Sequence, residues 1–215
     1  MGIVQHNPAR GIPKPKKPVR LPVFVDEAAA RGLYQITENA VQEGDDEFCA
    51  LRDQLIVTIL YETGIRQAEL LNLKDSDLDE SIGQIKVLGK RNKMRYVPIG
   101  REMTQKLQEY IKMRDEQNFH RTSDHLFVTE RGKKISKTFV YLKVKSYLSQ
   151  VTTIKRKSPH VLRHTFATHM LNNGADLNVI KEILGHSSLA ATQVYTHNSI
   201  EKLKSIHSRM HPRNN

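Results

Sequence analysis

The chain has 215 residues, with 34 Lys and Arg against 23 Asp and Glu, which gives a formal net charge of +11. Hydrophobic residues make up 38% and charged residues 27%, which excludes disorder throughout and a fibrous repeat. The single cysteine, Cys49, excludes an intrachain disulfide and a cysteine-based zinc cluster, and no apolar run approaches the roughly 20 residues that cross a bilayer.

The positive excess favours a polyanionic partner, most often nucleic acid. The alternative is a basic protein whose charges only solvate its surface. The lone cysteine fits a reducing compartment, so we expect a cytoplasmic protein with no membrane partner.

Residues 1–22 differ from the rest because they contain five prolines, five basic residues and no acid. Such a segment is extended and cannot form a core. We expect an interdomain linker or an arm that follows phosphates, and the basic residues offered for DNA contact are Lys14, Lys16 and Lys17. The alternative for residues 1–12 is a disordered tail.

The pattern from residue 26 onward is helical. Apolar residues of period 3.6 between Phe48 and Leu60 predict a helix that ends at Thr63-Gly64, followed by a short helix that carries Arg66. Two short extended runs, 84–88 and 95–99, predict an antiparallel hairpin. Further helices are expected at 101–118, 137–150, 159–173, 176–184, 188–195 and about 199–209, with a buried stub at 126–128. The predicted fold class is therefore α+β, mainly helical, with one small antiparallel sheet.

Four short stretches carry residues suited to phosphate chemistry. They are 63–70 (TGIRQAEL), 89–90 (GK) at the hairpin turn, 158–169 (SPHVLRHTFATH), and 184–188 (LGHSS) followed by Tyr195. His160 and Arg163 share one face near a helix start, where an anion gains the helix dipole and a guanidinium fork. Arg66 offers a second fork, and Glu69 lies one turn later to hold it. Each feature alone has an ordinary alternative: a surface pair, an exposed turn lysine or a core-edge tyrosine.

A metal site is not favoured by these stretches. His160 and His164 are four residues apart, but Arg163 between them would repel a dication, and the cysteine or carboxylate partner that such pairs usually have is missing. We therefore expect no metal and no cofactor.

Taken together, the order Arg66, Lys90, His160-x-x-Arg163, His186, Tyr195 resembles the catalytic set of the tyrosine recombinase (phage integrase) family, and within it bacterial Xer-type recombinases. The flanking residues of each stretch also fit, over roughly residues 21–212. The resemblance implies the catalytic-domain fold of that family, residues 23–215, and site-specific recombination of double-stranded DNA in a DNA-bound tetramer.

The mechanism that the resemblance implies needs neither metal nor ATP. Tyr195 attacks the phosphodiester to form a 3′-phosphotyrosyl link, Arg66 and Arg163 stabilise the phosphoryl oxygens, and Lys90 protonates the leaving 5′-hydroxyl. His160 assists proton transfer, His186 donates to the phosphate, and Glu69 supports Arg66. Around the hairpin, Arg91, Lys93 and Arg95 are the expected DNA contacts.

The chain departs from the family in two places. The N-terminal domain that usually clamps the other face of the DNA is absent, so we expect an excised catalytic domain preceded by its linker. Arg91 stands where many relatives have glycine, although Asn92 can take the left-handed conformation, which keeps Lys90 as the expected lysine and Lys93 as the fallback.

Two other functions stay open from the sequence. A type IB topoisomerase-like enzyme would use the same chemistry without a tetramer, and a DNA-binding module would use none. The apolar face of the expected helix 199–209, which resembles the segment that docks on a neighbouring protomer in this family, favours recombination.

Overall fold

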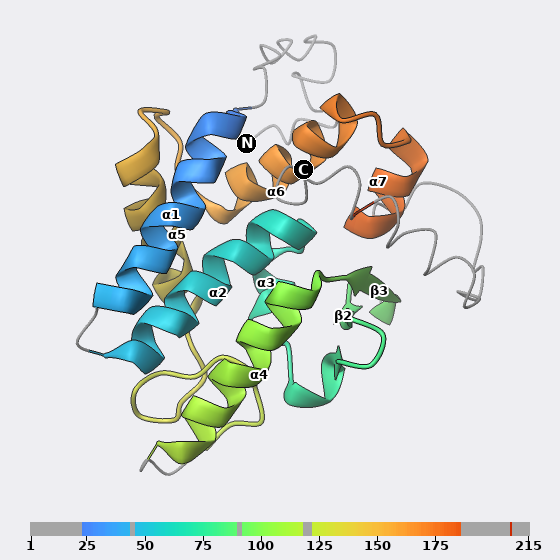
Figure 1. The fold of residues 1–215 in the computed structure, drawn as a ribbon. Coiled ribbons are helices and arrows are strands. Elements are labelled where there is room, and N and C mark those ends of the chain that lie inside the picture. Colours follow the sequence, from blue (N-terminus) through green and yellow to red (C-terminus); the bar gives the residue numbers. More distant parts are fainter. Residues whose placement is uncertain (1–22, 44–45, 90–91, 118–121, 186–206, 208–215) are drawn as a thin grey trace, which may run out of the picture.

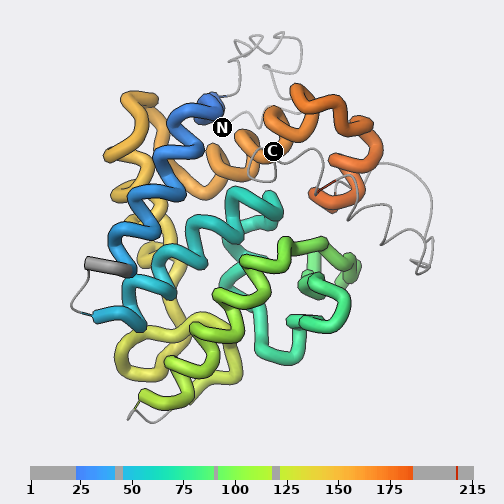
Figure 2. Tube along the Cα trace, viewed as in Figure 1, coloured from blue at the N-terminus to red at the C-terminus, as the bar shows by residue number. Residues whose placement is uncertain are grey.

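The structure is a computed structural model that describes residues 23–43, 46–89, 92–117, 122–185 and 207 (Figures 1 and 2). The strands follow one another along the chain between two groups of helices, which confirms the predicted α+β class, mainly helical with one small sheet. The elements are α1 Glu27–Glu43, α2 Glu47–Thr63, α3 Gln67–Leu70, the 3₁₀ turn η2 Asp75–Asp77, β1 Leu78–Asp79, β2 Gln84–Leu88, β3 Met94–Pro98, α4 Arg101–Glu116, α5 Lys137–Val151, α6 Pro159–Asn172 and α7 Leu177–Leu184.

Helix α2 forms the centre of the core. Asp46 caps its start by accepting a hydrogen bond from the Cys49 N–H at 3.0 Å, and Gly64 ends it in the left-handed conformation, with φ 61°. The sequence predicted an apolar stripe, but residues 51–63 are buried on every side. The reason is that α1, α4, α5 and α6 all pack against this helix (Figure 1), which leaves it no solvent-facing side.

The small sheet lies beside α4 and α7, at the opposite side of α2 from α1 and α5 (Figure 1). Its antiparallel order is β1-β2-β3, and β2 pairs with β3 from Gln84↔Pro98 to Leu88↔Met94. The hairpin was predicted, but the two-residue strand β1 was not, because so short a strand shows no alternation. Asn92 takes the left-handed conformation, with φ 60°, as its place in the turn predicted.

Helices α5, α6 and α7 follow close to the predicted bounds. Asp176 caps α7 by accepting from the Asn178 N–H at 2.7 Å, and Gly185 ends it with φ 63°. Of the helices expected at 188–195 and 199–209, only His207 lies within the described residues. It is helical and buried, and its Nε2 lies 2.8 Å from the carbonyl oxygen of Glu62.

Candidate active site

The turn between α2 and α3 positions Arg66. Arg66 caps α3, and its backbone N–H donates to Glu69 Oε2 at 2.8 Å while its Nη1 donates to Glu69 Oε1 at 2.8 Å. The Arg66–Glu69 pair expected from the three-residue spacing is therefore present. The Arg66 side chain keeps 27% of its surface exposed, whereas that of Glu69 keeps 4%. Glu69 therefore binds the Arg66 guanidinium on its buried side, and the other side of Arg66 remains exposed.

Arg163 approaches the same place from α6. Its Nη1 donates to the Gly64 carbonyl at 2.5 Å and its Nη2 to the Leu184 carbonyl at 2.8 Å. Arg66 Nη2 donates to the next carbonyl along, that of Gly185, at 3.3 Å. The turns that end α2 and α7 thus hold the two guanidinium groups that the sequence assigned to the phosphate.

Positive charge exceeds negative charge at this place. Burial, and then the nearby charge of Arg66, lower the pKa of Arg163 to about 10. Burial also acts to raise the pKa of the Glu69 carboxyl, but hydrogen bonds and charge from Arg95 and Arg66 outweigh it and hold that pKa below its usual range. Within the described residues, Glu69 is the single carboxylate paired with these arginines, so the arrangement attracts an anion.

The expectation that Arg95 contacts DNA does not fit its position. Its side chain is only 4% exposed, its Nη1 and Nη2 donate to Glu69 at 3.0 and 2.8 Å, and its Nε donates to the Ile183 carbonyl at 2.6 Å. The missed signal was strand alternation: Arg95 and Val97 point to the same, buried face of β3. We correct this assignment, because a buried guanidinium with these partners does not face a ligand.

Two of the other expected site residues lie within the described part of the chain. His160 is exposed at the start of α6, one turn before Arg163, and Lys93 is exposed in the hairpin turn. Several lie outside the described residues: Lys90, His186, Tyr195, Lys14, Lys16, Lys17 and Arg91.

The immediate neighbours of two of these residues do reach the site. A Cβ on Gly89 would lie 3.6 Å from both Glu69 Oε1 and Arg95 Nη1, and Gly89 directly precedes Lys90. Gly185, which accepts from Arg66, directly precedes His186. Lys90 therefore follows a residue that lies beside Glu69 and Arg95, and His186 follows one that contacts Arg66.

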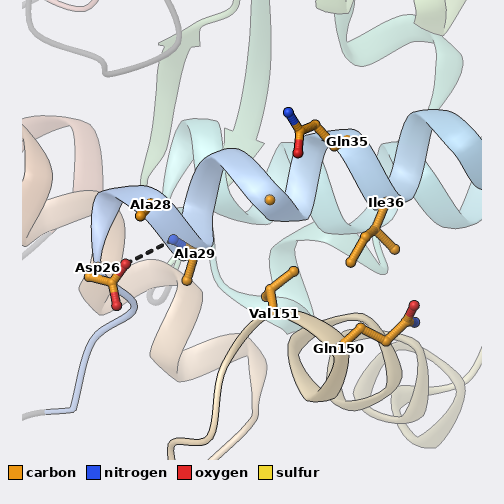
Figure 3. A pocket seen from close by; sticks show the side chains of 8 residues that line it. Asp26, Ala28, Ala29, Gln35, Ile36, Gln150 and Val151 are labelled. Atoms are coloured by element: carbon orange, nitrogen blue, oxygen red, sulfur yellow. Dashed lines mark hydrogen bonds between the residues drawn. The ribbon is translucent and has the colours of Figure 1, made fainter.

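A shallow pocket elsewhere in the molecule is not the candidate site (Figure 3). It lies between α1 and α5, and its lining includes Ala29, Ile36, Gln150 and Val151. Its one carboxylate, Asp26, accepts from the Ala29 N–H at 2.8 Å and so caps α1. The pocket has no group to polarise a phosphodiester.

Among the residues that the structure describes, no group of three or more His, Cys, Asp or Glu is placed to hold a metal ion. In the same part of the chain, no helix is long and apolar enough to cross a membrane.

The fold and the similarity to known proteins identify a tyrosine-type DNA recombinase. The sequence matches the phage integrase family over residues 24–202, and the chain belongs to that family. It is 38% identical to tyrosine recombinase XerC of Chlorobaculum parvum, over 98% of this chain and 67% of that protein. It is 37% identical to XerC of Listeria innocua, over 98% and 69%.

Solved structures agree with this assignment. XerA recombinase superposes with a TM-score of 0.66 at 32% identity, covering 90% of this chain and 66% of that one. XerH site-specific recombinase bound to palindromic difH substrate, a post-cleavage complex, gives 0.68 at 25% identity, covering 88% and 53%. The chain spans about two thirds of the length of the XerC relatives it matches.

Proposed function

We propose that this chain cleaves and rejoins double-stranded DNA through a 3′-phosphotyrosyl intermediate, as the catalytic domain of a site-specific recombinase. The observation that carries the proposal is the convergence of Arg66 and Arg163 on the turn at Leu184 and Gly185, where Glu69 pairs with Arg66. Two guanidinium forks at one place suit the non-bridging oxygens of a phosphodiester.

Cleavage exchanges one phosphate ester bond for another. The Tyr195 oxygen forms a bond to phosphorus as the bond from phosphorus to the 5′-oxygen breaks. The tyrosine proton passes to His160, and Lys90 supplies a proton to the departing 5′-oxygen. Arg66, Arg163 and His186 stabilise the charge on the phosphoryl oxygens, and one such donor contributes roughly 10²–10³ in rate. Rejoining is the reverse, so no ATP is required.

This mechanism assigns no step to a metal ion or a cofactor. The phosphate charge is balanced by guanidinium, ammonium and imidazole groups of the chain itself. Cleavage is therefore expected to be the same in a chelator as in added magnesium.

The DNA surface extends beyond the arginines in this proposal. Helix α5 exposes Lys137, Tyr141 and Lys145, which are spaced four residues apart and so share one face. Gln67 Nε2 donates to the Lys137 carbonyl at 2.7 Å, which ties the start of α5 to the helix beside Arg66. Lys93 and the residues outside the described part, Lys14, Lys16, Lys17 and Arg91, are assigned to phosphate contacts.

The organisation proposed for the whole protein follows the same reasoning. Residues 23–215 form the catalytic domain, residues 1–22 link it to a DNA-clamping domain, and helix 199–209 docks on a neighbouring protomer of a DNA-bound tetramer. The XerH recombinase was solved bound to palindromic difH substrate, which supports DNA as the partner proposed here. A bacterial cytoplasmic location is part of the same proposal.

A suicide substrate tests the chemistry directly. A duplex nicked next to the scissile phosphate loses its short 5′-hydroxyl fragment, so the covalent complex accumulates and is seen on a denaturing gel. We expect an adduct with the unmodified chain, with or without EDTA, and none with Tyr195→Phe, which loses one hydroxyl and should keep its DNA affinity. An adduct from the Phe variant would show that another residue is the nucleophile.

The adduct assay and a relaxation assay on supercoiled DNA together distinguish the alternatives. The absence of any adduct would favour a DNA-binding module. Relaxation of one supercoiled duplex without strand transfer to a second would favour a topoisomerase-like enzyme.

A further inference from the structure

We propose that Arg95 is a positioning residue of the strand-cleavage reaction, which holds Arg66 through Glu69 and the turn before His186 through Ile183. The proposal rests on the proposed function of the site. Arg95 does not contact DNA in this account and acts only through other residues.

Arg95 and Arg66 are connected through the carboxylate of Glu69, to which both donate hydrogen bonds. Its Oε1 accepts from Arg66 Nη1 and Arg95 Nη1, and its Oε2 accepts from the Arg66 backbone N–H and Arg95 Nη2. A carboxylate has about four acceptor positions, and these four donors occupy them. Half of them come from Arg95, so its removal leaves a buried carboxylate that only Arg66 can satisfy.

The electrostatic consequence concerns Arg66. A buried carboxylate paired with a single arginine would neutralise that arginine and draw its guanidinium inward. Arg66 and Arg95 together carry two positive charges against the one negative charge of Glu69. The Arg66 guanidinium therefore keeps a net positive potential toward a phosphate. Glu69 thus orients Arg66 without cancelling it.

Arg95 also supports the turn that ends α7. Its Nε donates to the Ile183 carbonyl at 2.6 Å, in the last turn of that helix. Gly185 packs against the guanidinium so closely that a Cβ there would lie 3.1 Å from Arg95 Nη1 and 3.2 Å from Cζ. The Arg95 side chain therefore contacts both Glu69, which holds Arg66, and the turn that precedes His186. Arg95 itself lies on β3, the strand that follows the hairpin turn containing Lys90.

Lysine cannot replace this arrangement. Its ammonium is a point charge, whereas the arginine fork reaches both oxygens of Glu69 and the Ile183 carbonyl at once. Arg95→Lys therefore keeps the charge and the strand but loses the geometry, which makes it the informative variant.

The chain offers a matched control in Arg114. This arginine of α4 is also buried, donates to both oxygens of Asp75 at 2.8 Å and to the Leu126 carbonyl at 2.9 Å, and lies on elements that hold no candidate site residue. Arg114→Lys therefore removes a similar buried fork at a place where cleavage should not depend on it.

The experiment measures DNA affinity and the rate of adduct formation at saturating suicide substrate. For Arg95→Lys we expect an adduct rate lower by about 10²-fold, as misplaced catalytic groups cause, with unchanged affinity and salt dependence. Arg114→Lys should keep the adduct rate while lowering the melting temperature. In a double-mutant cycle, adding Arg95→Lys to Glu69→Gln should cost far less than it does in the unmodified chain.

Each other outcome counts against the proposal. Weaker DNA binding with a shallower salt dependence would make Arg95 a DNA contact. Equal rate losses in Arg95→Lys and Arg114→Lys, or effects that simply multiply in the cycle, would make it only structural. An unmodified chain that forms no adduct would overturn the proposed function together with this inference.

Discussion

Arg66 and Arg163 donate to consecutive carbonyl groups, Arg66 to that of Gly185 at 3.3 Å and Arg163 to that of Leu184 at 2.8 Å. Two cations held this close repel each other, and the lowered pKa of Arg163, about 10, reflects that repulsion after the effect of burial. An anion bound by both relieves the repulsion, which is the electrostatic condition of a phosphate site.

Arg163→Lys should show how much the fork at this position contributes. Lysine keeps the charge but cannot reach both the Gly64 and Leu184 carbonyls and a phosphate oxygen. We expect the adduct rate at saturating DNA to fall by about 10²–10³, with affinity changed little. A rate within a few-fold of the unmodified chain would remove Arg163 from the mechanism.

DNA binding should depend steeply on salt, measured with the Tyr195→Phe variant so that no cleavage occurs. For roughly 6–10 phosphate contacts, affinity should fall by about 10³–10⁵ between about 50 and 200 mM salt. Lys145→Gln should reduce the slope of log K against log salt by about 1. Lys106→Gln is the control, because Lys106 pairs with Glu38 and Glu102 at 3.2 Å. Equal slopes in all three proteins would contradict the α5 contacts.

Gly64→Ala should destabilise the chain and slow cleavage. Gly64 has φ 61°, and a Cβ there would lie 2.6 Å from Phe166 Cδ1 and 2.7 Å from Leu184 Cδ2. The left-handed conformation costs about 1–2 kcal/mol for a residue with a Cβ, and overpacking adds about 1–3 kcal/mol. The shift of Leu184 would also move the carbonyl that holds Arg163.

Gly174→Ala is the matched control for that variant. Gly174 has φ 87°, but a Cβ there would meet no atom within 4 Å. It should therefore show the conformational cost alone in urea unfolding and keep the adduct rate. Equal losses of stability at the two positions would contradict the packing argument.

How much the sequence could predict depended on whether a feature is local. The end of α2 at Gly64, the hairpin and the left-handed Asn92 follow from neighbours along the chain, and they were predicted. The full burial of α2 depends on which distant elements cover it. Strand alternation with Val97 already indicated that Arg95 faces inward, and that signal was missed. Its partners could not be predicted locally, because Glu69 and Ile183 come from other parts of the chain.

Stability should depend on pH through His169, which binds the backbone at the start of the described chain. His169 is buried, and its Nε2 lies 2.9 Å from the Val25 carbonyl while its Nδ1 lies 2.9 Å from the Tyr61 hydroxyl. A carbonyl only accepts, so Nε2 carries the hydrogen and, in the neutral ring, the Tyr61 hydroxyl donates to Nδ1. Burial lowers the pKa of His169 below its usual value.

The sign of the effect follows from that shift. As pH falls below about 6.5, the usual histidine pKa, the unfolded chain takes up a proton before the folded chain does, so the free energy of unfolding decreases. His169→Gln has no such group, and we expect it to lose less stability than the unmodified chain between about pH 7.5 and about pH 5.5 in urea unfolding. Tyr61→Phe should be less stable at both pH values but keep the steeper dependence, because burial and not the hydroxyl lowers the pKa. If His169→Gln and the unmodified chain lose the same stability over this range, the pH dependence arises from other groups, and the buried His207 is the first of them to test.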